Sequence, residues 1–280
     1  MICKILGDVA VPLHRSTADF SRPQSLEEVI VQSKPRVVIN CAAWTAVDAA
    51  EESPQDCHCV NADAVFHIAK ACNEIDATLV QVSTDYVFGA DAGRVDPYTE
   101  TDTPCPVNHY GVTKLAGEKA AATAQQHLIA RTCGLYSPSE GGPVRGKNFA
   151  DTMLVLSRSR NDLQVVNDQL CTPSFVPHVA NGILDLLGKE ARGIYHVVND
   201  GSTSWHSFAS ELFSQTGIAL RPKGIPTDAY PTVAPRPRFS VLSTKKFASS
   251  TGHYLPHWKQ GISAYIEMIQ TTSTQKERCA

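Results

Sequence analysis

The feature that most constrains the fold is an alternation, in the first half of the chain, between short apolar runs and segments of helical spacing. The apolar runs have the length and the β-branched content of buried strands. We expect them to form strands at residues 9–13, 36–40, 78–83 and 127–131. Residues 60–71 and 112–126 lie between such runs and carry apolar side chains at helical intervals. The alternation predicts the α/β class, with a doubly wound parallel sheet covered by helices on both faces.

After residue 137 the alternation loosens. Helices are expected at residues 148–157, 177–187, 205–216 and 257–269, and a strand at residues 193–198. Residues 222–237 are rich in proline and are expected to form either a surface loop or a flap that faces a substrate. We therefore predict a sheet domain over residues 1–137, a smaller α/β lobe over residues 138–270 that is interleaved with it, and a polar tail over residues 271–280.

The composition is that of an ordinary soluble protein and argues against several classes of partner. Hydrophobic residues make up 42% of the chain and charged residues 19%. No apolar run approaches the roughly 20 residues that cross a bilayer. The net charge is −3 without a basic run, so neither nucleic acid nor an anionic membrane is expected as a partner. The N-terminus lacks the pattern of a secretion signal, and we expect a cytoplasmic protein.

The chain has 9 cysteines, an odd number, scattered through expected core and loop segments alike. A secreted disulfide scaffold would be shorter and regularly paired, so reduced thiols are expected. The run Cys57-His58-Cys59 could suggest a metal site. Residues two apart on a helix face away from each other, however, and no second Cys/His pair lies at ligand spacing. We expect no metal site.

Polar residues gather where two of the expected strands end. Asn40 is followed by small residues, which would let a flat cofactor lie against the backbone. The next strand ends in Ser83-Thr84-Asp85-Tyr86, a cluster of hydroxyls and a carboxylate. Because open parallel sheets bind ligands at the carboxyl ends of their strands, we expect both segments to face one crevice.

Tyr110 and Lys114 open the helix that follows this cluster, and their spacing of four residues places them on one helix face. A free phenol has a pKa of about 10, and a neighbouring ammonium favours the phenolate, which would bring the group nearer to the working range of an acid–base catalyst. Lys114 could also donate to ribose hydroxyls. Thr84 would hydrogen-bond a substrate carbonyl, and Tyr110 would protonate its oxygen as hydride arrives. The alternative is a surface lysine above a packed tyrosine.

Three segments make the chain resemble a known family. Residues 40–48, 83–89 and 110–118 are similar to dTDP-4-dehydrorhamnose reductase, a family of the extended short-chain dehydrogenases. The likeness continues through residues 131–132, 148–149, 166–169, 193–196 and 236–237. The resemblance implies a Rossmann-like fold whose first domain binds a dinucleotide and whose smaller lobe binds mainly the substrate. It implies an oxidoreductase that uses NADPH or NADH to reduce the 4-keto group of dTDP-4-dehydro-L-rhamnose, giving dTDP-L-rhamnose.

The resemblance also implies roles for individual residues. Tyr110 would be the proton donor, Lys114 would bind the cofactor, and Thr84 would complete the catalytic set. The residues expected to contact the cofactor are Asp19, Phe20, Ala43, Trp44, Thr45, Tyr110 and Lys114. Those expected to contact the nucleotide sugar are Thr84, Asp85 and Gly134.

The chain departs from the family pattern at two places. Gly134 follows Arg-Thr-Cys where the family often has an aromatic residue that contacts the sugar nucleotide, so the substrate pocket is expected to differ. Dinucleotide folds also open with a strand and a glycine-rich turn that holds the pyrophosphate, and only Gly7 is offered here. We expect the first strand and glycine loop to be missing, either through a start downstream of the true one, which we favour, or with residues 2–6 as a substitute strand. Poor cofactor affinity would follow.

Several alternatives stay open. His14 and Arg15 would suit the 2′-phosphate of NADPH, or they form a solvated loop pair. The second candidate function is a non-catalytic relative that binds a partner protein, resembling the regulatory subunit of methionine adenosyltransferase. The missing glycine loop supports this alternative, whereas the retained catalytic residues Tyr110, Lys114 and Thr84 argue against it. An epimerase or dehydratase is disfavoured because Asp85-Tyr86 does not supply the acidic pair that a dehydratase needs. The sequence leaves a homodimer open.

Overall fold

A parallel sheet forms the centre of the computed structural model, which describes residues 1–91, 93–139 and 148–279. Within these ranges the main sheet has four strands in the order β1 (Val37–Asn40), β2 (Thr78–Thr84), β3 (His127–Thr132) and β6 (Gly193–His196). All neighbouring strands are parallel, and their register aligns Thr84 with Thr132 at the carboxyl ends. The three strands predicted between residues 36 and 131 are confirmed, and so is the α/β class.

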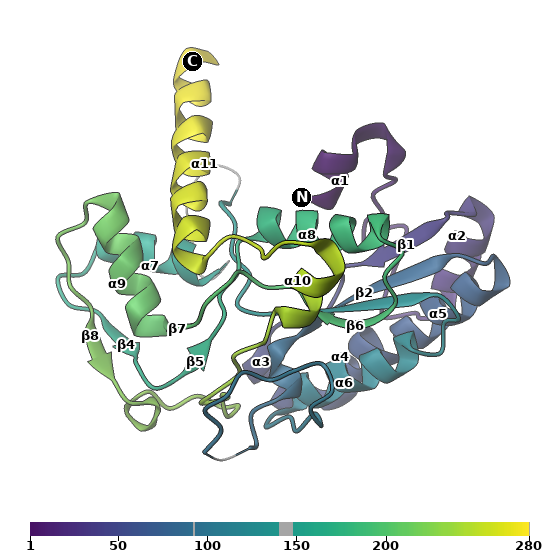
Figure 1. Cartoon of the computed structure of the whole chain (residues 1–280), viewed down its shortest axis with the longest axis horizontal. Helices are drawn as coiled ribbons and strands as arrows, with labels where there is room; N and C mark the ends of the chain where they lie inside the picture. The colour runs from purple at the N-terminus through teal and green to yellow at the C-terminus, as the bar shows by residue number, and fades with distance from the viewer. Residues whose placement is uncertain (92, 140–147, 280) are drawn as a thin grey trace.

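Helices cover both faces of this sheet (Figure 1). Leu79 and Ile129 point to one face and pack in a cluster with residues of α2 (Ser25–Ser33), α5 (Ala64–Glu74) and α6 (His109–Ala121). The neighbouring strand residues Val80 and Leu128 point the other way, toward α8 (Val176–Gly188) and α10 (Lys245–Thr251). Because side chains alternate along a strand and both faces are buried, consecutive residues in the middle of these strands, Leu79-Val80 and Leu128-Ile129, are apolar rather than alternating with polar ones. The fold is therefore doubly wound, as predicted.

A second lobe has its own apolar core beside the sheet (Figure 1). The core gathers residues of three helices, α7 (Phe149–Ser157), α9 (Trp205–Thr216) and α11 (Trp258–Cys279). Two short strand pairs complete the lobe: β4 (Gln164–Val166) runs parallel to β8 (Lys223–Ile225), and β5 (Leu170–Cys171) runs antiparallel to β7 (Thr203–Ser204). The helices predicted at residues 148–157 and 205–216 are confirmed within one residue.

The two halves of the chain are interleaved. Strand β6 and helix α8 come from the second half, yet they complete the sheet of the first. Helix α11 continues to Cys279, through most of the segment predicted as a polar tail. The domain boundaries themselves stay a prediction.

The remaining elements are α1 (Ile2–Leu6), η1 (Gly7–Val9), α3 (Val47–Glu52), α4 (Pro54–His58), η2 (Cys59–Asp63), η3 (Asp85–Val87) and η4 (Thr227–Ala229). No helix among the described residues is both long and apolar enough to cross a membrane.

The strand predicted at residues 9–13 is wrong. A short 3-10 turn, Gly7–Val9, occupies the start of this segment, and the chain then continues without regular structure. Val9 and Val11 are 83% and 79% exposed, so the apolar pattern finds neither a neighbouring strand nor a core to cover it. Residues 2–6 are also not a substitute strand, because they form the helix α1. A β-branched run forms a strand only where a partner strand accepts its backbone hydrogen bonds.

The strand ends that carry the candidate site rest on a buried ion pair. Arg131 donates from Nε and Nη2 to the two carboxylate oxygens of Glu118, over 2.9 and 2.8 Å. The same carboxylate accepts a 2.6 Å hydrogen bond from the hydroxyl of Ser83. Helix α6 lies close against this edge, because a Cβ on Gly111 would come within 2.2 Å of the backbone oxygen of Tyr86. Helix α6 and strands β2 and β3 are thereby locked together.

Candidate active site

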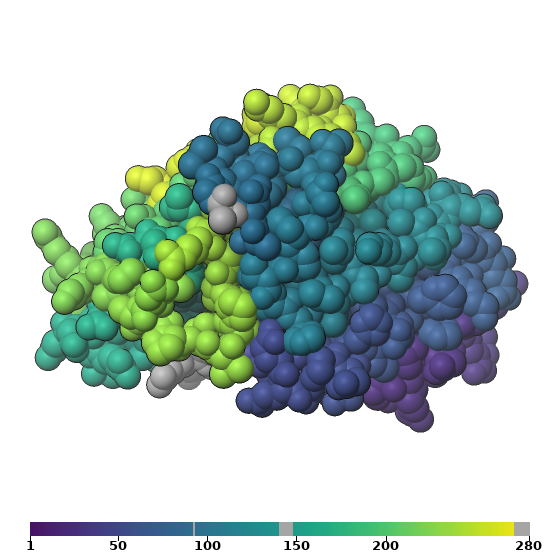
Figure 2. Space-filling view, turned by 90° about the horizontal axis from the view of Figure 1, so that it is seen from below, coloured from purple at the N-terminus to yellow at the C-terminus, as the bar shows by residue number. Residues whose placement is uncertain are grey.

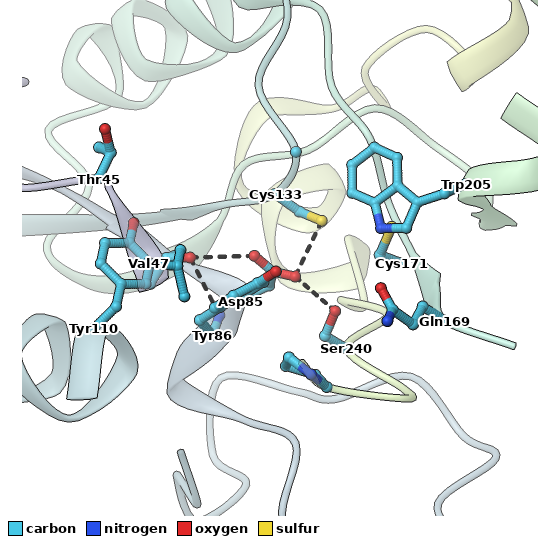
Figure 3. Close-up of a pocket in the computed structure, with 13 residues that line it drawn as sticks. Thr45, Val47, Asp85, Tyr86, Tyr110, Cys133, Gln169, Cys171, Trp205 and Ser240 are labelled. Atoms are coloured by element: carbon cyan, nitrogen blue, oxygen red, sulfur yellow. Dashed lines mark hydrogen bonds between the residues drawn. The ribbon is translucent and has the colours of Figure 1, made fainter. Parts of the chain in front are cut away.

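A cavity of about 180 Å³ opens at the carboxyl ends of β2 and β3, between the sheet and the second lobe (Figure 3). Residues from both halves of the chain line it: Thr45, Val47, Thr84, Asp85, Tyr86, Tyr110, Cys133, Gly134, Gln169, Cys171, Trp205, Pro237 and Ser240. Parallel sheets expose strand ends and loop residues at this edge, which is where the sequence predicted a crevice. The structure therefore brings Thr84, Asp85, Tyr110 and Gly134 to one place.

The proline-rich segment, residues 222–237, contacts the sheet domain, and Figure 2 shows the yellow-green surface of this part of the chain beside the blue and purple surface of the first half. Asp48 accepts hydrogen bonds from the amide of Ala234 at 2.9 Å and from Arg236 at 3.0 Å. Asn108 donates to the backbone oxygen of Pro235 at 2.9 Å. The segment contains β8 and η4, and more than half of its residues are exposed, as a surface loop predicts. Its end, Pro237, lines the cavity, and a contact of this segment with a substrate stays a prediction.

Thr84 and Tyr110 form one wall of the cavity. Thr84 ends β2, and its hydroxyl accepts a 3.2 Å hydrogen bond from the amide of Tyr86. Tyr110 lies in the first turn of α6, which Asn108 caps by accepting a 2.8 Å bond from the amide of Gly111. The hydroxyls of Thr84 and Tyr110 face the same cavity, and the neighbouring Thr84 hydroxyl lowers the pKa of Tyr110 against the effect of burial. A hydroxyl and a phenol that share one wall can both reach a single substrate oxygen.

Burial raises the pKa of Tyr110, and the neighbouring hydroxyl of Thr84 opposes that shift only in part. The direction is opposite to the sequence-based expectation that the ammonium of Lys114 would favour the phenolate. Lys114 is 3% exposed, and its Nζ donates to the backbone oxygen of Val82 at 2.7 Å. Desolvation of the phenol therefore outweighs the nearby cation. Tyr110 is accordingly a protonated phenol at neutral pH.

Lys114 lies one helical turn beyond Tyr110, behind the cavity wall rather than on it. Burial lowers its pKa to about 8, and the nearby carboxylate of Glu118 opposes that shift. An ammonium has three donors, and the one acceptor of Nζ among the described residues is Val82 O. The alternative of a surface lysine is wrong, because this side chain is buried. Two donors remain for a ligand that reaches this depth.

Asp85 lies at the centre of the cavity and is 2% exposed (Figure 3). It accepts hydrogen bonds from the hydroxyl of Ser240 at 2.6 Å, from the thiol of Cys133 at 3.1 Å and from the hydroxyl of Thr84 at 3.2 Å. Burial raises the pKa of Asp85, and these hydrogen bonds lower it. Asp85 thus connects the end of β2 to Cys133, which follows β3, and to Ser240, which follows the proline-rich segment.

The predicted cofactor stretch 43–45 lies in the loop between β1 and α3. Asn61 holds this loop, because its side chain accepts a 2.9 Å bond from the amide of Trp44 and donates a 3.2 Å bond to the oxygen of the same residue. Asn61 lies in a π-helical turn, Cys59–Asp63, that precedes α5. Of the stretch, Thr45 lines the cavity. The sequence did not lead us to Asn61. An asparagine among the apolar residues of a predicted helix is the signal that could have identified it.

Asp19 and Phe20 lie outside the cavity lining. The hydroxyl and amide of Ser21 donate to Asp19, and these bonds lower its pKa against the effect of desolvation. Phe20 packs against the apolar cluster beneath α5. Arg22 also donates to Asp19 at 3.1 Å. The structure therefore does not bring this pair together with Tyr110, and its contact with a cofactor stays a prediction.

The run Cys57-His58-Cys59 has no common ligand geometry. Cys57 is buried against the hydroxyl of Thr113 at 3.2 Å, whereas His58 lies 3.5 Å from Asp63. Across the described ranges, no three His, Cys, Asp or Glu side chains form a group that could hold a metal ion.

Known proteins share both the sequence and the fold. A family model described as the RmlD substrate binding domain matches residues 4–271. The dTDP-4-dehydrorhamnose reductase of Shigella flexneri is 39% identical over 279 residues, which cover 95% of this chain and 91% of the relative. The chain belongs to the dTDP-4-dehydrorhamnose reductase family. The resemblance found in the sequence is confirmed.

Solved structures extend this assignment to three dimensions. The dTDP-4-dehydrorhamnose reductase from Bacillus anthracis, in complex with NADP, has a TM-score of 0.86 and 31% identity, covering 92% of this chain and 89% of its own. A Clostridium acetobutylicum dTDP-4-dehydrorhamnose reductase has a TM-score of 0.89 and 35% identity, covering 96% and 94%. A Thermotoga maritima UDP-glucose 4-epimerase, 17% identical with a TM-score of 0.74, shares the fold alone.

The sequence did not predict most of the residues through which the second lobe lines the cavity. Gln169, Cys171, Trp205 and Ser240 all line it. Gln169 lies in a segment that carried the family likeness, but nothing in its spacing placed it near Tyr110. The signal for Trp205 was weaker still, an aromatic residue at the start of a helix. These residues reach the cavity through pairing of distant segments rather than through local periodicity.

Proposed function

We propose that this chain reduces the 4-keto group of dTDP-4-dehydro-L-rhamnose to a hydroxyl, giving dTDP-L-rhamnose, with NADPH or NADH as cofactor. The observation that carries the proposal is that Thr84 and Tyr110 line the same cavity, with Lys114 buried one helical turn behind Tyr110. Two relatives named dTDP-4-dehydrorhamnose reductase, at 39% and 40% identity, support the choice of substrate.

The chemistry assigned to the protein is proton delivery and orientation. The bound nicotinamide supplies the hydride that adds to the keto carbon. When the substrate binds, the hydroxyl of Thr84 would turn from Asp85, to which it donates at 3.2 Å, and donate to the keto oxygen, orienting it toward Tyr110. As this oxygen gains negative charge, the phenol of Tyr110 gives up its proton to it, so the carbonyl gains one hydride and one proton. The raised pKa of Tyr110 keeps that proton in place at neutral pH until charge develops.

Lys114 has the donors that a dinucleotide requires. A buried ammonium with one backbone acceptor can donate to two ribose hydroxyls and offset the charge of a phenolate. Ala43, Trp44 and Thr45 would lie against the cofactor, in a loop that Asn61 fixes. Asp19 and Phe20 would hold its adenine end.

The substrate contacts proposed here are Thr84, Asp85 and Gly134, all of which line the cavity. For the cofactor we propose NADPH, because the related Bacillus anthracis reductase is described in complex with NADP. A cytoplasmic location is supported by the cysteines, since all eight whose side chains the structure describes are free thiols.

The test follows NADPH oxidation when dTDP-4-dehydro-L-rhamnose is added. Wild type should consume NADPH only in the presence of the keto sugar. Tyr110→Phe should lower kcat by about 10²–10⁴ while dTDP-L-rhamnose still binds, because only the proton donor is removed. Tyr254→Phe, at an exposed tyrosine, is the matched control and should turn over normally. Binding of the sugar nucleotide without turnover by wild type would instead favour the non-catalytic alternative.

A further inference from the structure

A tryptophan and a glutamine form the end of the cavity that lies away from Tyr110 (Figure 3). Trp205 is the first residue of α9, which Ser204 caps by accepting a 3.1 Å bond from the amide of Ser207. Gln169 immediately precedes β5 and is 8% exposed. Both residues belong to the second lobe, whereas Tyr110 and Thr84 belong to the sheet domain.

The pairing of β5 with β7 brings these two residues together. The antiparallel register pairs Leu170 with Ser204 and Cys171 with Thr203. Continued by one residue, the register places Gln169 opposite Trp205. Leu170 is also held from the other side, because its amide donates to Arg238 O and its oxygen accepts from Ser240 N, both at 2.9 Å. The two side chains thus project from a backbone that is fixed on both edges.

Gly134 leaves the space that the indole ring occupies. Its φ is +48°, and a Cβ at this position would come within 2.8 Å of the ring of Trp205 and within 3.3 Å of the Cα of Pro173. The same ring packs on Phe149, with centroids 4.7 Å apart. Any side chain at position 134 would therefore displace the ring or strain the backbone. The orientation of the Trp205 ring therefore depends on a glycine at position 134.

The polar atoms at this end are free to bind a ligand. Among the described residues, the indole N–H of Trp205 has no hydrogen-bond acceptor. The amide nitrogen of Gln169 donates to the hydroxyl of Thr227 at 3.2 Å, and that hydroxyl in turn donates to Asp168 at 2.6 Å. This chain of bonds orients the amide and leaves its oxygen without a donor in the described part of the chain. The cavity end therefore offers an aromatic face, one donor and one acceptor.

We propose that Trp205 and Gln169 form the subsite for the sugar ring, with Gly134 as the residue that sets the position of the indole. This inference rests on the proposed function, because the keto group that meets Thr84 and Tyr110 belongs to the same ring. The indole face covers the C–H face of the sugar, and the amide oxygen accepts from a sugar hydroxyl.

The size of the cavity favours the sugar over the nucleotide as occupant. Its volume of about 180 Å³ is below the roughly 300–1,000 Å³ of sites that enclose a drug-sized ligand. A sugar ring fits such a space, whereas the dTDP portion extends outside it. A subsite at this end then distinguishes one sugar from another and contributes little to binding of the nucleotide alone.

Binding measurements by calorimetry with two probes, dTDP-L-rhamnose and dTDP, test the subsite. Trp205→Ala should weaken binding of dTDP-L-rhamnose by about tenfold or more, the loss expected for a buried aromatic contact, and change binding of dTDP by less than about twofold. Gly134→Ala should act in the same direction, because it displaces the ring. Trp205→Phe keeps an aromatic face and should lose less. Trp258→Phe, in the same core but not on the cavity, is the matched control.

Three outcomes would overturn the subsite. Equal losses for both probes would place Trp205 on the nucleotide, and unchanged binding in Trp205→Ala and Gly134→Ala would remove the residues from recognition. If Trp205→Ala does not fold, unchanged binding by Gly134→Ala and Gln169→Leu overturns the proposal. Normal turnover by wild type in any of these cases leaves the reductase function standing. Wild type that neither turns over the keto sugar nor binds either probe would overturn both.

Discussion

The reacting end of the cavity lies on regular elements of the sheet domain, whereas the sugar end lies on short strands and loop segments of the second lobe. Thr84 ends β2, and Tyr110 lies in α6, which packs against the sheet over the buried Glu118–Arg131 pair. Gln169 and Trp205 depend on a strand pair of only two residues each. The groups that deliver the proton are therefore held by a packed sheet and helix, whereas the residues of the sugar end depend on a short pairing between distant segments.

The largest expected effect concerns the buried Glu118–Arg131 ion pair beneath the reacting end. Glu118→Gln removes a buried carboxylate and leaves the guanidinium of Arg131, which is 1% exposed, without its counter-charge. Because an uncompensated buried charge is costly, the free energy of unfolding should fall by about 3–5 kcal/mol. Chemical denaturation measures it, with the exposed Glu267→Gln as control. A loss below about 1 kcal/mol would mean that the ion pair does not support this end.

Thr84→Val tests the chemistry at the same end. The substitution keeps the shape of the side chain and removes the hydroxyl that orients the keto oxygen, so kcat should fall by about a hundredfold. Binding of dTDP-L-rhamnose should stay within about twofold of wild type. Thr84→Ser should recover most of the activity. If Thr84→Val loses binding of dTDP-L-rhamnose but keeps its kcat, Thr84 serves recognition rather than chemistry, and the proposed division between the two ends is wrong.

The pH profile of kcat/KM should follow Lys114, whose pKa burial lowers to about 8. The ammonium is the working form, so kcat/KM should fall about tenfold for each pH unit above that value. The contribution of this residue to stability runs the other way. Between about 8 and the ordinary value of 10.5 the unfolded chain binds more protons, so this contribution rises with pH. Lys114→Arg, which stays charged, should flatten the fall; an unchanged profile would exclude Lys114 as its source.

The smallest expected effect concerns the sugar end. Ser204→Ala removes the cap of α9, next to Trp205, and should cost about 1 kcal/mol of stability. It should raise the KM for the keto sugar severalfold and leave kcat unchanged, because the first turn of α9 carries the indole. Steady-state kinetics with thermal unfolding checks both values. A fall in kcat without a change in KM would assign the helix start to the chemistry.

The sequence predicts the reacting end because its geometry is local. Tyr110 and Lys114 lie four residues apart on one helix, and Thr84 ends a strand whose apolar run is plain. The strand expected at residues 9–13 failed for the opposite reason, since a strand depends on a partner that its own residues do not specify. Gln169 and Trp205 likewise meet through a register between distant segments. The raised pKa of Tyr110 also needed the structure, because burial decides its direction.

A labelling experiment tests hydride transfer to the keto carbon, using NADPH that carries deuterium at both C4 positions of the nicotinamide. Wild type is given this cofactor with dTDP-4-dehydro-L-rhamnose, and the sugar product is analysed by mass spectrometry and NMR. We expect dTDP-L-rhamnose with one deuterium at carbon 4 of the sugar, formed far more slowly by Tyr110→Phe. A product without deuterium at that carbon, or equal rates in the two proteins, would contradict this expectation.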